Sequence, residues 1–251
     1  MRLNFLIKKE YIFLHALNQH QVNEPFKGWS QFILNEWDKH PQECYLLAGF
    51  AEWPLLDKNK SLKTLSKKAE KLLKKWLQAP QAKKLVKETE KYCDWLQKEW
   101  SKKGEVALRE LEKIIKIPLP KKEIFVYITH PKLKNGFAIS PEIITWGHSE
   151  DWPNYSIVYL CHEIMHIIFW NEKEDKKNTI HAIIELAIDN ELRIRLNKKG
   201  QYFKQGKFDI GHPNLEQTEK EILPAWKKYL KNQNQNIKQF IKSQKKKTNK
   251  K

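Results

Sequence analysis

The feature that most constrains this chain is an apolar segment, residues 157–170, that contains the pattern His-Glu-x-x-His at 162–166. Its length and composition predict a helix, on which residues four apart share a face. His162 and His166 would then direct both imidazoles to one point, with Glu163 beside them. This arrangement is typical of a zinc ion bound by two histidines with a glutamate as general base. The alternative is an amphipathic helix with two ordinary surface histidines.

A catalytic zinc usually has three protein ligands, and the next segment offers a third. Residues 178–196 predict a second helix, in which His181, Glu185 and Asp189 form a polar stripe among apolar residues. A carboxylate in apolar surroundings costs free energy unless it is paired or bound to metal. We therefore predict Glu185 as the third ligand. The alternative is a glutamate on the solvent-exposed edge of the helix.

The spacing of these residues resembles that of the thermolysin-like gluzincin metallopeptidases: HExxH, eighteen residues, Glu, and Asp four residues later. The resemblance implies that His162, His166 and Glu185 bind zinc. It also implies that Asp189 holds the other ring nitrogen of His162. Glu163 would be the base and not a ligand. The matching region covers roughly residues 121–196.

The metzincin pattern does not fit, because Phe169 and Glu172 stand where that class has Gly and His. Peptidases of the gluzincin class also need a donor for the developing oxyanion. The segment 200–213 offers His212 and Tyr202, although each is more often a loop or packing residue than a catalytic one. His181 either lines the cleft or faces solvent. His130 and His148 flank the predicted strands, and we expect both to be peripheral to the site.

The segment before the HExxH helix predicts a small sheet. Residues 123–129, 135–139 and 143–146 are rich in β-forming residues. Strands followed by an HExxH helix predict an α+β, zincin-like catalytic region, made of a small sheet, the active-site helix and a second ligand helix. Residues 135–139 resemble the edge strand on which such peptidases bind extended substrates. The alternative is a hairpin that only supports the helix.

Three regions are predicted along the chain: a mostly helical region at 1–120, the zincin-like region at 121–232 and a basic tail at 233–251. Within the first, residues 1–58 predict a short strand and two or three helices, and further helices are expected at 62–77, 85–100 and 105–117. The role of residues 1–120 stays open between a substrate-selecting lid, a partner-binding module and a scaffold.

The charge is concentrated near the C-terminal end. Ten lysines and no acidic residue lie in 222–251, so this stretch accounts for 10 of the net +17. Its end is polar enough to predict disorder. Nucleic-acid binding is possible for such a tail, but only four arginines accompany 43 lysines, and phosphate or base recognition favours arginine.

The cellular setting is predicted from cysteines and apolar runs. The three cysteines are scattered and odd in number, which favours a reducing cytoplasm. No apolar run reaches membrane-spanning length, so no membrane association is expected. Cys161 precedes a motif histidine, but adjacent helix positions point about 100° apart, so it is predicted as a core residue.

Together these patterns predict a zinc-dependent metallopeptidase that acts on a peptide or protein substrate. Hydrolysis of a non-peptide amide would use the same residues. The alternative from another class is a binding or regulatory protein derived from a metallopeptidase, without proteolytic activity, whose basic tail binds a nucleic acid or an acidic partner. Glu163 argues against that alternative, because a structural zinc site has no need of a base.

Overall fold

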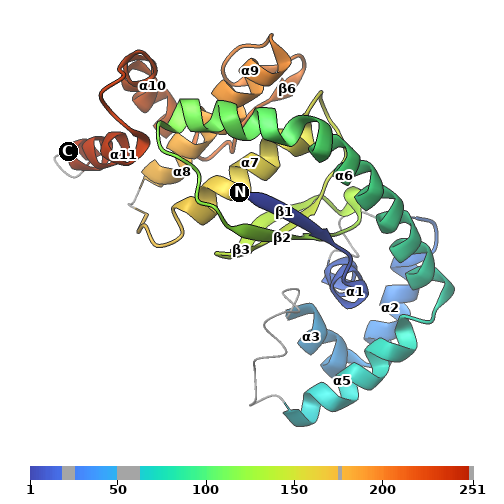
Figure 1. Ribbon diagram of the computed structural model, residues 1–251. Helices are drawn as coiled ribbons and strands as arrows, with labels where there is room; N and C mark the ends of the chain where they lie inside the picture. Colours follow the sequence, from blue (N-terminus) through green and yellow to red (C-terminus); the bar gives the residue numbers. More distant parts are fainter. Residues whose placement is uncertain (19–25, 50–62, 175–176, 249–251) are drawn as a thin grey trace. The chain divides into compact units, whose positions relative to one another are not determined.

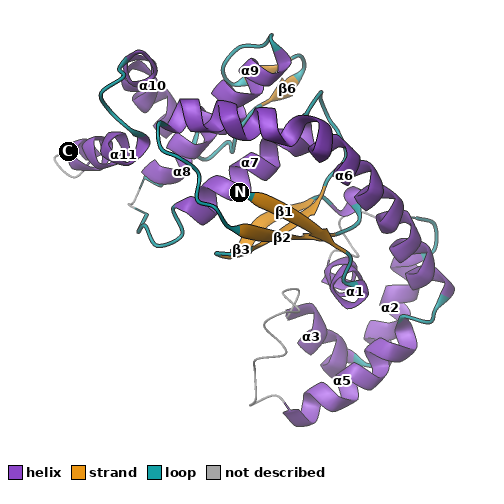
Figure 2. Cartoon of the chain, viewed as in Figure 1, coloured by secondary structure: helices purple, strands orange, loops and turns teal. Residues whose placement is uncertain are grey.

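The computed structural model describes residues 1–18, 26–49, 63–174 and 177–248 (Figures 1 and 2). The chain is α+β, with many helices and a small mixed sheet, as predicted at the level of fold class. It divides into two compact units. We call residues 3–97 and 123–149 the sheet unit, and residues 1–2, 98–122 and 150–251 the HExxH unit.

This division differs from the predicted boundary after residue 120, because the chain passes between the units several times. Helix α6 (Pro80–Ile115) runs from one unit into the other without a break. We predicted two helices over this stretch, at 85–100 and 105–117. Gly104 lies between them but does not end the helix. Its missing side chain leaves room for Trp100, whose Cε2 would lie 2.6 Å from a Cβ at Gly104.

The sheet unit contains the three predicted strands. Its four-stranded sheet has the order β1-β2-β4-β3, with β2 parallel and β3 antiparallel to β4 (Figure 2). The strands are β1 (Arg2–Leu6), β2 (Glu123–Ile128), β3 (Asn135–Ser140) and β4 (Ile143–Gly147). β3 is therefore an edge strand of the described sheet, as predicted.

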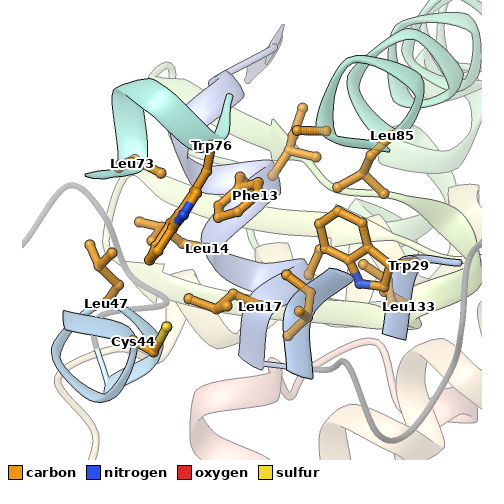
Figure 3. Packing of buried hydrophobic residues seen from close by; sticks show 14 of the residues in the cluster. Phe13, Leu14, Leu17, Trp29, Cys44, Leu47, Leu73, Trp76, Leu85 and Leu133 are labelled. Atoms are coloured by element: carbon orange, nitrogen blue, oxygen red, sulfur yellow. The ribbon is translucent and has the colours of Figure 1, made fainter. Parts of the chain in front are cut away.

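The helices of the sheet unit share one aromatic and aliphatic core. They are α1 (Lys9–Asn18), α2 (Trp29–Lys39), α3 (Pro41–Gly49) and α5 (Lys63–Trp76), with a 3₁₀ turn at Pro131–Leu133. Phe13 lies between two tryptophans, with its ring centroid 5.7 Å from Trp29 and 5.9 Å from Trp76 (Figure 3). The predicted strand and helices of 1–58 are confirmed for the described residues; 19–25 and 50–58 lie outside them.

The HExxH unit is mainly helical. It contains α7 (Tyr155–Ile168), α8 (Thr179–Glu185), the π-helix η3 (Leu186–Leu192), α9 (Arg193–Asn197), the strands β5 (Lys204–Gln205) and β6 (Phe208–Asp209), α10 (Glu216–Lys231) and α11 (Ile237–Thr248). The helix predicted at 178–196 is thus present as three consecutive helical segments. The chain leaves the α-helical pattern directly after Glu185.

Glutamates cap the two helices that carry the motif residues. At the start of α7, the backbone N–H of Ser156 donates to Glu150 Oε1 at 2.8 Å. At the start of α8, the N–H groups of Ile180 and His181 donate to the carboxylate of Glu174 at 3.2 and 3.0 Å. A carboxylate at a helix N-terminus satisfies unpaired N–H groups and favours the helix dipole. Both helices therefore begin at defined residues.

The predicted disorder of the basic tail is wrong for residues 237–248, which form α11. Three apolar residues with helical spacing, Ile237, Phe240 and Ile241, are buried. The Phe240 ring centroid lies 4.8 Å from that of Tyr229 and 5.7 Å from that of Trp226, both on α10. This apolar face stabilises the helix, although its other face carries lysines. No described helix is long and apolar enough to span a bilayer.

Candidate metal centre

The two motif histidines converge in the structure. His162 and His166 lie one turn apart on α7, and their Nε2 atoms face each other at 3.0 Å. A tetrahedral zinc with Zn–N bonds of about 2.0–2.1 Å places two ligand nitrogens roughly 3.3 Å apart. His162 is buried and His166 is partly buried, so the two nitrogens meet in surroundings that largely exclude water. The pair has the geometry of two ligands to one ion.

Asp189 lies where the sequence predicted it. Its Oδ1 accepts a hydrogen bond of 2.8 Å from His162 Nδ1, and its side chain is fully buried. Asp189 belongs to η3, and π-helical turns are frequent at functional sites. Arg193 Nε donates to the backbone oxygen of Asp189 at 2.6 Å, while Asn190 Nδ2 donates to the backbone oxygen of Glu185 at 3.2 Å. Both side chains therefore bond backbone oxygens in or just before the π-helix, and these bonds hold Asp189 in place.

His181 joins the motif pair more closely than the sequence indicated. The potential ligand atoms of His162, His166 and His181 all lie within 4.8 Å of one another. The ring centroids of His166 and His181 are 4.7 Å apart. Within the described residues, the buried Nε2 of His181 has no hydrogen-bond partner. Such a nitrogen costs free energy unless something binds it, so it fits a metal ligand.

Glu185, the predicted third ligand, belongs to a second group of possible ligands, with His181 and His212. Its side chain is fully buried. Oε2 accepts a hydrogen bond of 2.9 Å from the His212 backbone N–H, and Oε1 accepts one from His212 Nδ1. The distance from Oε1 to His181 Nε2 is 3.6 Å. His181 is thus common to the motif pair and to the group that contains Glu185.

The loop before His212 is shaped around Glu185. Gly211 has φ of +92°, a conformation that favours glycine. A Cβ at Gly211 would lie 2.4 Å from Glu185 Oε2. The absence of a side chain therefore allows the loop to approach the carboxylate, so that His212 can contact it. Sequence reasoning placed His212 in this loop but predicted no contact with Glu185.

Glu163, the predicted base, is buried beside the histidines, with 6 % of its surface exposed. Burial lowers the pKa of His162, but the nearby Asp189, Glu163 and Glu185 carboxylates outweigh it and raise that pKa to about 9. Glu163 is therefore close enough to act electrostatically on His162.

The other two histidines near the site stay neutral over a wide pH range. Burial, reinforced by neighbouring histidines, lowers the pKa of His166 to about 2. Burial is also the main reason why the pKa of His181 falls to about 4. A neutral imidazole carries the lone pair that a metal needs. Both residues are therefore in the form that binds a cation at neutral pH.

One buried carboxyl of the site was missed by sequence reasoning. Glu219 of α10 is 1 % exposed, and its Oε1 accepts a hydrogen bond of 3.3 Å from Asn190 Nδ2. Burial, together with the charges of Glu185 and Asp189, raises the pKa of Glu219 to about 9. It is therefore neutral at pH 7. No motif surrounds Glu219, and only the packing of α10 against α8 and η3 brings it here.

The remaining candidates have other contacts. Tyr202 donates to Glu191 Oε2 at 2.6 Å and accepts from Trp226 Nε1 at 3.0 Å, so its hydroxyl belongs to a different network. His130 and His148 belong to the sheet unit. There His130 Nε2 lies 3.1 Å from Glu88, and the backbone oxygen of His148 accepts from Tyr92. Neither lies in the histidine cluster of the HExxH unit.

No protein-family model matches this chain, and neither the curated proteins nor the solved structures contain a match. The resemblance to gluzincins is therefore carried by the spacing of the motif residues in the sequence alone.

Proposed function

We propose that this chain is a zinc-dependent metallopeptidase whose ion is held by His162, His166 and a third ligand from the second helix. Glu185 is our choice of third ligand by motif spacing, and His181 is the competing donor because of its position. The observation that carries the proposal is the 3.0 Å approach of the two Nε2 atoms, with His162 Nδ1 bonded to buried Asp189.

The donor set fits zinc. Imidazole nitrogens with one carboxylate form the ligand type found in catalytic zinc sites, which keep one position open. The buried Nε2 of His181, which has no hydrogen-bond partner among the described residues, further supports a cation here, because its lone pair favours a positive neighbour. Asp189 would keep the proton of His162 on Nδ1, so that Nε2 presents its lone pair.

Zinc, when bound, supplies a Lewis acid that lowers the pKa of water and polarises a carbonyl. Glu163 would take the proton from the attacking water and deliver it to the nitrogen as the carbon–nitrogen bond breaks. His212, half exposed at the site, would donate to the oxyanion that develops on the carbonyl oxygen. The hydrogen bond with Glu185 raises the pKa of His212, which favours its donor form.

The peptide nature of the substrate rests on the motif spacing. HExxH, eighteen residues and then Glu185 is the pattern that resembles metallopeptidases. A non-peptide amide would be hydrolysed by the same residues, so the polypeptide assay below decides between the two substrate classes.

The test is hydrolysis of an unstructured polypeptide, such as casein, by the zinc-loaded parent and by Glu163→Gln. Loss of the base is expected to lower kcat/KM by about 10²- to 10⁴-fold while zinc stays bound. Glu172→Gln, an exposed glutamate just beyond α7, is the matched control and should cleave like the parent. A parent that binds zinc but cleaves nothing would favour the binding-protein alternative. Equal cleavage by Glu163→Gln would refute the mechanism.

A further inference from the structure

The site contains more potential ligands than one catalytic zinc requires. One such ion uses three protein ligands and keeps a fourth position for water. Here four histidines and one glutamate form two groups of possible ligands that share His181. The first group is His162, His166 and His181, and the second is His181, Glu185 and His212. Building on the proposed zinc site, we propose that His181, Glu185 and His212 form a second divalent-cation site beside it.

The second group is compact. The ring centroids of His181 and His212 are 4.9 Å apart. Glu185 Oε1 faces both rings, 3.6 Å from His181 Nε2 and in contact with His212 Nδ1. Two imidazoles and a carboxylate suit zinc and neighbouring transition metals rather than magnesium or calcium. The second site therefore takes the same class of ion as the first.

Two residues are candidates for both ions, His181 by position and Glu185 by motif spacing. A neutral imidazole binds an ion through one nitrogen, so His181 serves one ion at a time. With both ions bound, His181 would belong to the second site, and the first ion would keep His162 and His166. His212 would bind the second ion through Nδ1, which faces Glu185, and keep its Nε2–H as the donor to the oxyanion.

The loop around Gly211 indicates a formed site rather than a chance approach of side chains. The His212 backbone N–H fixes Glu185 Oε2, and the missing Cβ of Gly211 permits that contact. Oε1 is thereby oriented toward the imidazoles. His212 is more than half exposed, whereas His162 is almost fully buried. The second ion is therefore expected to bind more weakly and to exchange faster than the first.

The experiment is equilibrium dialysis of the untagged 251-residue chain against buffered zinc at pH 7.5, followed by elemental analysis. The parent is expected to bind one zinc at low free concentration and two at high concentration. His212→Ala should lose the weaker ion and keep the tighter one. His148→Ala is the matched control. It removes a histidine that belongs to neither group, so this variant should still bind two zinc ions.

Each other outcome has one meaning. A parent that binds only one zinc, or a His212→Ala variant that still binds two, overturns the second site and leaves the proposed zinc enzyme standing. A parent that binds no zinc overturns both proposals. His181→Ala is a second variant, independent of the loop, and is also expected to lose the weaker ion. Circular dichroism of each variant checks that the fold is retained.

Discussion

Asp189 and His162 are joined by a 2.8 Å hydrogen bond between the carboxylate Oδ1 and ring Nδ1, although 27 residues separate them in the sequence. A carboxylate only accepts, so Nδ1 donates, and Nε2, which faces His166, is the nitrogen left for an ion to bind. Both side chains are buried, which strengthens their interaction. This contact orients the first histidine of the motif before any ion binds.

We expect Asp189→Asn to weaken zinc binding by about 10- to 100-fold, the usual effect of losing a partner that orients a ligand. The amide has nearly the same shape, so the fold should be retained, but it lacks the charge that favours binding of a cation. Competition with a chromophoric chelator measures the change. Asp209→Asn, on exposed strand β6, should bind zinc like the parent. Equal affinities for all three proteins would contradict a role of Asp189 in orienting His162.

The parts of the site that follow helical periodicity were predictable from sequence. His162 and His166 share a face because of their spacing, and Asp189 was expected beside His162 from the resemblance to the gluzincin spacing. His212 and Glu219 reach the site through a loop and through α10, and no local pattern predicts where such segments pack. That His181 rather than Glu185 lies beside the motif pair also depends on three-dimensional packing, including the π-helical segment after Glu185.

The tail shows why charge is a poor guide to order. Its lysines predicted disorder, yet Ile237, Phe240 and Ile241 lie at i, i+3 and i+4 and form one apolar face. Periodicity of the few apolar residues was more informative here than the number of charges. The lysines can remain solvated on the opposite face while the apolar face packs on α10.

If α11 is part of the folded core, Phe240→Ala should destabilise the protein by about 3 kcal/mol or more, as for other buried phenylalanines. Phe240 is 2 % exposed and contacts Trp226 and Tyr229. Urea unfolding monitored by tryptophan fluorescence measures the free energy. Lys242→Ala, on the exposed face of α11, should change it by less than about 0.5 kcal/mol. Equal stabilities of the two variants would mean that α11 does not pack as described.

The third prediction concerns acid stability of the sheet unit, where His15 of α1 is 4 % exposed. Its Nε2 has no hydrogen-bond partner within the described residues. Burial lowers the pKa of His15 from 6.5 to about 4. In the unfolded chain the imidazole is protonated below pH 6.5, whereas in the folded chain it stays neutral until about pH 4. The unfolded state therefore binds more protons in this window, so the free energy of unfolding falls as pH falls from 6.5 to 4.

Each unit of pKa shift corresponds to 1.36 kcal/mol, so His15 accounts for a loss of about 3 kcal/mol across the window. His15→Leu removes this titration. Between pH 7 and pH 4 the free energy of unfolding of the variant should therefore fall less than that of the parent, by about 3 kcal/mol. Comparing the pH-dependent changes, rather than the absolute stabilities, cancels the packing effect of leucine. If His15→Leu loses as much stability in acid as the parent does, the buried imidazole is not what makes the sheet unit acid-sensitive.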